Sequence, residues 1–205
     1  LTGVTLRAPS GASVISPNTT LMKETGLTAA EVGEVLGLSA DIDITTFNPY
    51  AAGVDAADAL AVEKVSQQIM ATISTFAAAT EGSGASAADA FSTALASVVD
   101  VVQQKSIAFK ADSTVTLDFA SSTDLASIQS TVTTKAATVS GVDKTALATM
   151  ADDTATAIKN VNAKIDTVSD LASDASKNVF STTQVLSEQV VTAAKTEAAG
   201  GTGSI

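Results

Sequence analysis

The sequence predicts a mostly all-α protein, an antiparallel helix bundle built from long helices rich in Ala and Val. Residues 55–80 contain neither Gly nor Pro, and apolar residues recur there at three- and four-residue steps, which is the period of an amphipathic helix. Aromatic residues make up only 3% of the chain and Trp is absent. The core must therefore consist of small side chains, which allow helix axes to approach to about 8 Å.

Two short helices are predicted near the N-terminus, over residues 17–25 and 28–36. Ser16 is a good N-cap, and Pro17 is tolerated at the first helical position. A capping box that begins at Thr28 starts the second helix. A Gly follows each helix, as is common where a helix ends.

A helical hairpin is predicted over residues 55–80 and 86–106, because a short Gly-containing turn separates the two stretches and short loops join antiparallel neighbours. The first helix should turn an apolar stripe toward a partner and a polar side toward water. The apolar stripe consists of Leu60, Val62, Val65, Ile69, Ile73 and Phe76. The polar side consists of Asp58, Glu63, Lys64, Gln67 and Gln68.

Residues 113–119 interrupt the helical pattern. Val115, Leu117 and Phe119 alternate there with polar residues, which is the period of a strand. A single strand is not stable alone. We expect either a small two-stranded β ribbon with residues 2–7, which also carry Thr, Val and Leu, or an extended connector.

The rest of the chain is predicted to be helical. Thr123 and Asp124 should cap a helix that ends at Gly141, and Asp143 should cap the long helical run that follows. A polar stretch at residues 169–176 predicts a break. A last helix and a Gly-rich tail complete the chain.

We expect two modules, residues 1–109 and residues 110–205, unless both halves form one continuous bundle. The first would hold the short helices and the hairpin, and the second another helical hairpin or bundle. The chain begins at Leu1 rather than Met, and its last residues have the composition of a flexible linker. We therefore expect it to be a piece of a longer polypeptide.

The composition argues against several classes of function. The formal net charge of −11 repels nucleic-acid phosphates and anionic lipid heads, and no apolar run approaches the roughly 18 residues of a spanning helix. We expect no nucleic-acid partner and no membrane insertion. Cys and His are absent, and no phosphate-binding loop or nucleophile elbow occurs. We therefore predict that the protein is not an enzyme and needs no cofactor, with calcium as the one candidate ligand.

The candidate calcium site lies in residues 38–49, where oxygen-bearing side chains at alternate positions resemble the opening of a calcium loop. The candidate ligands are Asp41, Asp43, Thr45 and Asn48. An EF-hand needs Gly at its sixth position and Glu at its twelfth. Counted from Asp41, these positions hold Thr46 and Ala52. A hydrogen-bonded turn is the alternative interpretation.

Several short motifs occur in succession in the first third of the chain. They are APSGA (8–12), ISPNTTL (15–21), GLTAAE (26–31), LGL (36–38) and DIDITTFNP (41–49). This succession resembles a helical module of very large secreted or surface-anchored bacterial proteins of the multidomain adhesin and RTX type, over about residues 8–60. The resemblance implies β-sandwich repeats as neighbours, an extracellular or cell-surface location, and a structural or adhesive setting. It carries no catalytic residue.

Together, these features predict a non-enzymatic structural or adhesive module that acts as a spacer, a scaffold or an assembly element. Its partners would be neighbouring domains of a larger polypeptide or copies of itself. Two alternatives stay open. The helices could present a groove for a ligand or for calcium, or the Ala-rich faces of residues 143–199 could pair between chains in a filament or sheath.

Overall fold

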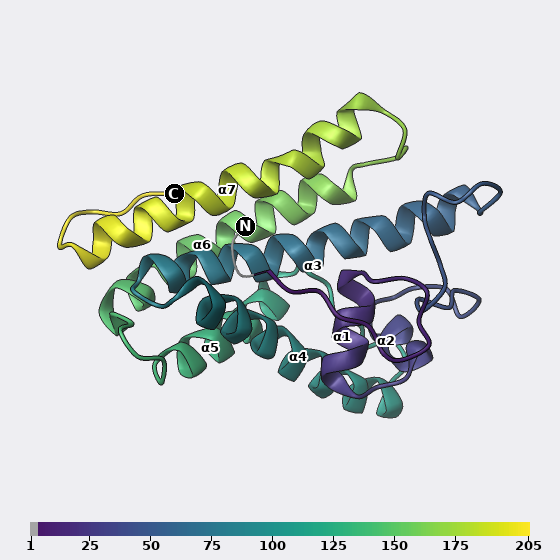
Figure 1. The fold of residues 1–205 in the computed structure, drawn as a ribbon, viewed down its shortest axis with the longest axis horizontal. Helices are drawn as coiled ribbons and strands as arrows, with labels where there is room; N and C mark the ends of the chain where they lie inside the picture. The colour runs from purple at the N-terminus through teal and green to yellow at the C-terminus, as the bar shows by residue number, and fades with distance from the viewer. Residues whose placement is uncertain (1–3) are drawn as a thin grey trace.

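The computed structural model describes residues 4–205, except for the side chains of residues 174–176, 180, 182–184 and 187. This part of the chain is all-helical, with seven α-helices and no strand (Figure 1). The helices are α1 (Pro17–Thr25), α2 (Ala29–Val35), α3 (Ala56–Gly82), α4 (Ala87–Ala111), α5 (Ser122–Ala136), α6 (Lys144–Asp166) and α7 (Asp174–Ala198). The predicted all-α class is confirmed.

Local capping explains where the two short helices begin and end. The Ser16 hydroxyl accepts a hydrogen bond from the Thr19 backbone N–H at 3.2 Å, so α1 starts at the predicted position. Gly26 has a left-handed backbone with φ of 71°, a conformation that Gly adopts without steric cost. Thr28 and Glu31 form the predicted reciprocal capping box at the start of α2.

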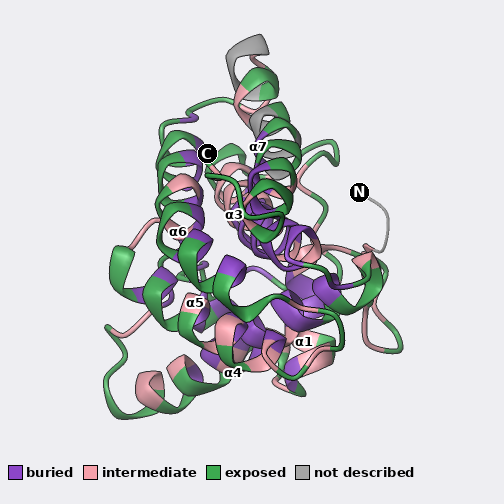
Figure 2. Ribbon diagram, turned by 90° about the vertical axis from the view of Figure 1, so that its left-hand side faces the viewer, coloured by how far each residue is buried: buried purple, intermediate pink, exposed green. Residues whose placement is uncertain are grey.

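Helix α3 is the central element of the molecule. It contacts α1, α4, α6 and α7. Figures 1 and 2 show it between α6 and α7 on one side and α4 and α5 on the other. Residues on its predicted apolar stripe, including Val62, Ile69 and Ile73, are buried. The prediction that Glu63 and Gln68 face water is wrong, because both residues are buried.

Small hydroxyl residues allow α3 to be buried without a strongly apolar composition. The buried members are Ser66, Thr72, Ser74, Thr75 and Thr80. Thr80 is accommodated by its own helix, since its hydroxyl donates to the Phe76 carbonyl in the preceding turn at 2.9 Å, whereas the hydroxyls of Ser74 and Thr75 have no hydrogen-bond partner among the described residues. A small polar group satisfied by its own helix can thus occupy a position that the sequence pattern assigns to either face.

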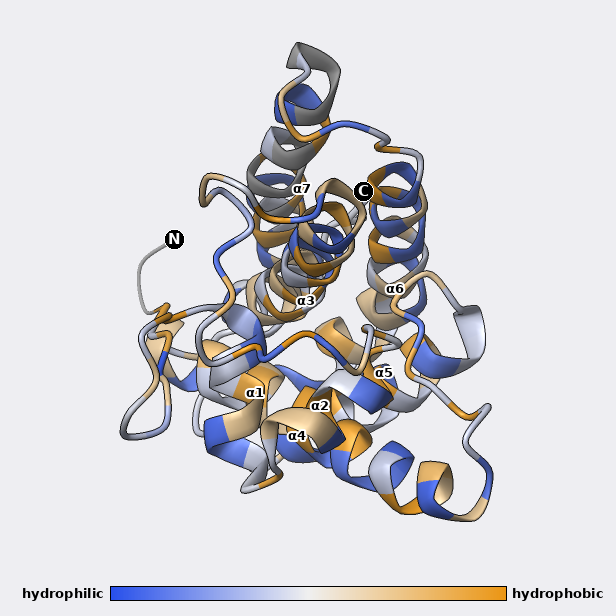
Figure 3. Cartoon of the chain, turned by 90° about the vertical axis from the view of Figure 1, so that its right-hand side faces the viewer, coloured by the Kyte–Doolittle hydropathy of each residue, from blue (hydrophilic) through white to orange (hydrophobic). Residues whose placement is uncertain are grey.

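Two hydrophobic clusters form most of the core, and each draws residues from before and after residue 110. The larger cluster extends from Leu21 in α1 to Ile158 in α6 and includes Phe76, Phe91 and Phe119. The smaller cluster joins Ala side chains of α3 to residues of α6 and α7. Figure 3 shows the apolar and polar residues of α6 on different sides of that helix.

The predicted β ribbon does not form. Residues 4–7 and 113–119 contain no strand, and residues 2 and 3 lie outside the described part of the chain. The backbone N–H of Leu117 instead donates to the Val35 carbonyl at the end of α2, at 2.8 Å. Leu117 and Phe119 are both buried. The alternating pattern therefore belongs to an extended connector that packs against helices, the second of the two expected outcomes.

The caps of the C-terminal helices follow the prediction in part. Asp143 accepts hydrogen bonds from the first backbone N–H groups of α6, as predicted. Helix α5 does not begin with a Thr123–Asp124 cap, because Asp124 accepts from the backbone N–H of Asp118 at 2.9 Å and pairs with Lys105 at 2.7 Å. Helix α5 also ends at Ala136, before the predicted end at Gly141.

Helices α3 and α7 approach each other closely where α3 ends. A Cβ atom added to Gly82 would lie 2.5 Å from Ala194 Cβ and 2.7 Å from the Val191 carbonyl oxygen. Only a residue without a side chain allows this approach.

Within the described residues, no helix combines the length and the apolar character needed to cross a membrane.

Candidate functional site

The connector at residues 38–49 lies between α2 and α3 and is held by the N-terminal segment, residues 4–15. The backbone N–H groups of Ser13 and Val14 donate to the Thr45 carbonyl at 2.9 and 3.2 Å. The apolar residues Ile42 and Ile44 point inward and are buried. This packing places the predicted metal ligands on a fixed surface loop.

The structure brings Asp43 and Thr45 together but uses Asn48 in a separate turn. The Asp43 carboxylate accepts from the backbone N–H of Thr45 at 2.9 Å and from its hydroxyl at 2.6 Å. The two hydrogen bonds lower the pKa of Asp43, with the hydroxyl as the larger cause. The Asn48 side-chain oxygen accepts from the Tyr50 backbone N–H at 3.0 Å. Asp41 is exposed.

These contacts are those of hydrogen-bonded Asx turns. Across the described residues, no group of three or more Asp, Glu, His or Cys side chains is placed to hold a metal ion. Calcium binding at Asp41, Asp43, Thr45 and Asn48 stays a prediction, and the turn is the arrangement to test against it.

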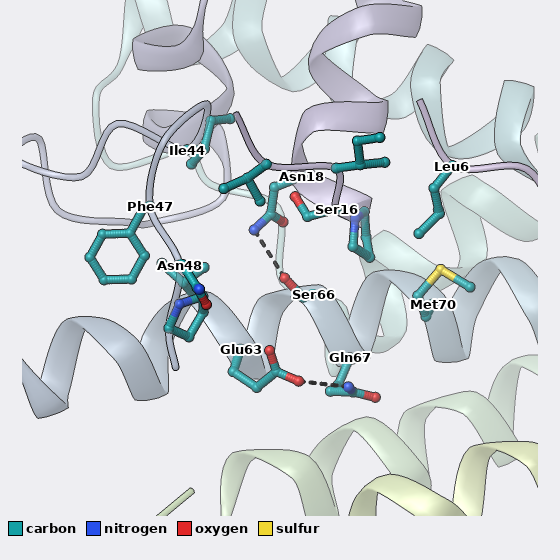
Figure 4. A pocket seen from close by; sticks show the side chains of 15 residues that line it. Leu6, Ser16, Asn18, Ile44, Phe47, Asn48, Glu63, Ser66, Gln67 and Met70 are labelled. Atoms are coloured by element: carbon teal, nitrogen blue, oxygen red, sulfur yellow. Dashed lines mark hydrogen bonds between the residues drawn. The ribbon is translucent and has the colours of Figure 1, made fainter. Parts of the chain in front are cut away.

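A cavity of about 370 Å³ opens beside the connector (Figure 4). Three elements form its wall: the N-terminal segment with the start of α1, the end of the connector, and α3 between Val62 and Met70. Most of the wall is apolar. Its apolar members include Leu6, Val14, Ile44, Phe47 and Met70. Packing between a helix and two irregular segments leaves this space, whereas the α3–α7 contact leaves no room for a single Cβ.

Asn18 contributes an incompletely bonded amide to the wall. Its side chain is 1% exposed and its Nδ2 donates to the Ser66 hydroxyl at 3.1 Å. Its Oδ1 has no hydrogen-bond partner among the described residues. With Ser66 as its one partner, the amide leaves one polar atom unpaired whichever way it is turned. An unpaired buried acceptor costs about 1–3 kcal/mol.

Glu63 places a carboxylate in the same wall. The residue is only 9% exposed, and its Oε1 accepts from Gln67 Nε2 at 2.7 Å. Among the residues that form the wall, all of them described, none is Lys or Arg. The neighbouring Lys64 directs its Nζ to the Asp166 carbonyl at 2.8 Å.

Tyr50 lies at the edge of this site. Its side chain is largely exposed. Partial burial, followed by the negative charge of Glu63 and a hydrogen bond to that carboxylate, raises the pKa of Tyr50 to about 12. The exposed Ile15 also contributes to the wall. The cavity therefore combines apolar walls with a buried carboxylate, and Tyr50 contacts that carboxylate from outside the wall.

A second buried polar group joins α3 to α6. Asn162 is 0% exposed, and its Nδ2 donates to the Thr72 hydroxyl at 3.1 Å and to the Phe119 carbonyl at 2.8 Å. Nearby, Gln68 Nε2 donates to the Asp166 carboxylate at 2.8 Å. These bonds cross between segments distant in sequence, so they fix the position of α6 along α3.

Of the predicted metal ligands, Asn48 lines the cavity, but sequence reasoning missed Asn18 and Glu63. Asn18 follows the predicted start of a helix, where polar residues are common. The helical period predicts that Glu63 lies on the water-facing side of its helix. Neither position carries a local signal of burial, because the burial comes from the N-terminal segment and the connector folding over α3.

Comparisons of the chain with protein-family models, with curated proteins and with solved structures found no match in any of the three.

Proposed function

We propose that this protein is a non-enzymatic structural or adhesive module of a secreted or surface-anchored bacterial protein. Its long helices would form an antiparallel bundle that acts as a spacer, a scaffold or an assembly element. In this role the helices hold neighbouring domains, or copies of the chain, at a fixed separation. The extracellular or cell-surface location rests on the motif resemblance in the first third of the chain.

The observation that supports a mechanical role best is the polar link through Asn162. This side chain joins α6 to α3 through Thr72 and to the 113–121 connector through Phe119. Buried hydrogen bonds between helices resist sliding, because a shift would leave each partner unpaired. A spacer needs this resistance along its length.

The charge of the chain also suits this role. The formal net charge of −11 favours solubility and opposes non-specific association with nucleic acid. Partners would then be recognised by specific surfaces of neighbouring domains or of a second copy.

The rigidity is testable with spin labels, because the chain contains no Cys and two introduced Cys residues would be unique. Ile107→Cys and Val185→Cys place labels at exposed positions on α4 and α7, on opposite sides of α3. Double electron–electron resonance should give one narrow distance distribution. A matched pair within α6, Thr149→Cys and Lys164→Cys, spans about 22 Å. Its distance distribution gives the width that is expected for two labels on a single rigid helix. A distribution between α4 and α7 much broader than this control would contradict a rigid spacer.

The location is tested separately. A protease or antibody added to intact cells of the producing bacterium should reach the module. Access only after cell lysis would contradict a surface location and leave the rigidity measurement unaffected.

A further inference from the structure

We propose that the cavity beside α3 binds an alkylammonium ion, a small molecule with an apolar chain and a protonated primary amine, with Glu63 as its counter-charge. This goes beyond the structural role proposed above. Failure of either proposal would leave the other unaffected, since one concerns rigidity and the other a ligand.

The first argument is the buried charge. Glu63 is 9% exposed and receives hydrogen bonds from Gln67 and Tyr50, but no Lys or Arg lies in the described wall of the cavity. A carboxylate that is removed from water without a cation is destabilised. A ligand cation in the cavity would supply the missing charge, and the interaction would be stronger there than in bulk water because the apolar walls lower the local dielectric constant.

The second argument is the shape and composition of the cavity. Its volume of about 370 Å³ falls within the usual range for small-molecule sites. Side chains such as Leu6, Val14 and Met70 line it and suit an alkyl chain. Phe47 is part of the wall, so an aromatic ring is available for a cation–π contact.

The third argument is the unpaired acceptor. Asn18 Oδ1 has no hydrogen-bond partner among the described residues, and an ammonium group offers three N–H donors and no acceptor. Protein atoms cover Asn18 almost completely, so contact with the ligand requires a small shift of the wall. Glu63 is therefore the primary contact and Asn18 a secondary one.

The start of α1 provides the main counter-argument, because a helix N-terminus favours an anion. Ser16 already caps this terminus through its contact with Thr19. The two possibilities predict opposite ligand charges. They are separated by three probes with the same alkyl chain: n-hexylamine, n-hexanol and hexanoate.

Isothermal titration of the full chain with each probe tests the proposal. We expect saturable binding of one n-hexylamine per chain, at least about tenfold tighter than n-hexanol, which corresponds to about 1.4 kcal/mol, and no binding of hexanoate. Hexanoate binding as tightly as n-hexylamine would overturn the proposal, as would the absence of n-hexylamine binding. All three titrations use the wild-type chain, so their results do not depend on the folding of a variant.

Glu63→Gln identifies the counter-charge. The amide keeps the size of the side chain and can still accept from Gln67, so helical circular dichroism should be unchanged. The affinity for n-hexylamine should fall at least about tenfold, to the level of n-hexanol. Glu34→Gln is the matched control, because Glu34 is an exposed Glu on α2 outside the cavity, and it should bind as wild type does. Unchanged affinity in Glu63→Gln, or equal losses in both variants, would overturn the assignment.

Discussion

The two halves of α3 pack in different ways. In the C-terminal half, from Ala71 to Gly82, three Ala side chains pack in one cluster with residues of α6 and α7, and at Gly82 helix α7 is too close for a Cβ atom. The N-terminal half, from Val62 to Met70, meets the N-terminal segment and the connector and borders a cavity of about 370 Å³. At these two places, the contact between α3 and α7 is closer than the contact between α3 and the irregular segments.

The same contrast appears in two buried Asn side chains. Asn162 donates through its Nδ2 to Thr72 and to Phe119 and so ties two segments to α3, although its Oδ1, like that of Asn18, has no hydrogen-bond partner among the described residues. Asn18 donates to Ser66 alone and borders the cavity. The first arrangement joins separate segments of the chain, and the second borders a space that a ligand could fill. The substitutions below probe this difference, in order of decreasing expected effect.

Asn162→Ala should produce the largest loss, about 3 kcal/mol in the free energy of unfolding, because it leaves the Phe119 carbonyl and the Thr72 hydroxyl without their donor. Urea denaturation measures this loss. The control is Asn160→Ala, an exposed position on the same helix, where the change should stay within about 0.5 kcal/mol. Equal losses of unfolding free energy in the two variants would show that the hydrogen bonds of Asn162 contribute nothing to stability.

Gly84→Ala tests the close approach just beyond the end of α3 and should cost about 2 kcal/mol. Gly84 has φ of +116°, and a Cβ atom there would overlap the Gly141 carbonyl oxygen. Gly53→Ala is the matched control, because Gly53 also has positive φ, +82°, but has open space around it. Thermal unfolding should show the greater loss in Gly84→Ala. The reverse order would contradict the close packing of this end.

Asp43→Ala tests the connector that borders the cavity. It should lower the free energy of unfolding by about 1 kcal/mol, since the loss of the carboxylate removes the two hydrogen bonds from Thr45. The loss should be the same with and without calcium if the loop is a hydrogen-bonded turn. A rise in the wild-type melting temperature with calcium that disappears in Asp43→Ala would instead support the calcium site.

Glu63→Gln should leave the free energy of unfolding unchanged or raise it by less than about 1 kcal/mol, because it removes a buried charge that has no cation beside it. Chemical denaturation at low ionic strength, with Glu34→Gln as the reference, measures the change. A loss of stability as large as that in Asn162→Ala would mean that the carboxylate is structural.

The smallest effect on stability is expected from the surface ion pair of Glu31 and Lys110. Its Oε1 and Nζ atoms lie 2.8 Å apart. The bond from Lys110, followed by the bonds from Thr28, lowers the pKa of Glu31 from 4.5 to about 2. A lowered pKa means that the pair stabilises the folded state above pH 4.5 and that this contribution is lost as the pH falls toward 2. Lys110→Met should therefore be slightly less stable than wild type at neutral pH and equal to it near pH 2. A difference that grew on acidification would contradict the assignment.

Sequence patterns predicted the parts of the fold that depend on neighbouring residues. The capping box at Thr28 and the cap at Asp143 are local hydrogen-bond devices, and both occur where predicted. The prediction of a β ribbon was wrong because the Leu117 backbone N–H donates to the carbonyl of Val35, a partner distant in sequence. Periodicity predicted the buried stripe of α3 but placed Glu63 in water. The helical period shows which residues share a face, but it does not show which other segments cover that face.

The candidate site was predictable only in part. The alternating oxygen-bearing side chains of residues 38–49 predict a ligand site, and Ile44 and residues 47–49 of this connector line the cavity. The polar residues opposite the connector, Asn18 and Glu63, carry no local signal. They become a site only when tertiary packing covers them.

Hydrogen exchange of the native chain tests most directly whether α3 holds the molecule together as one unit. The slowest-exchanging amides of α3, α4 and α6 should all give the same free energy of opening, equal to the free energy of global unfolding. Exchange of α6 and α7 at a clearly lower free energy, while α3 and α4 stay protected, would show two separately opening parts and contradict a rigid module built on α3.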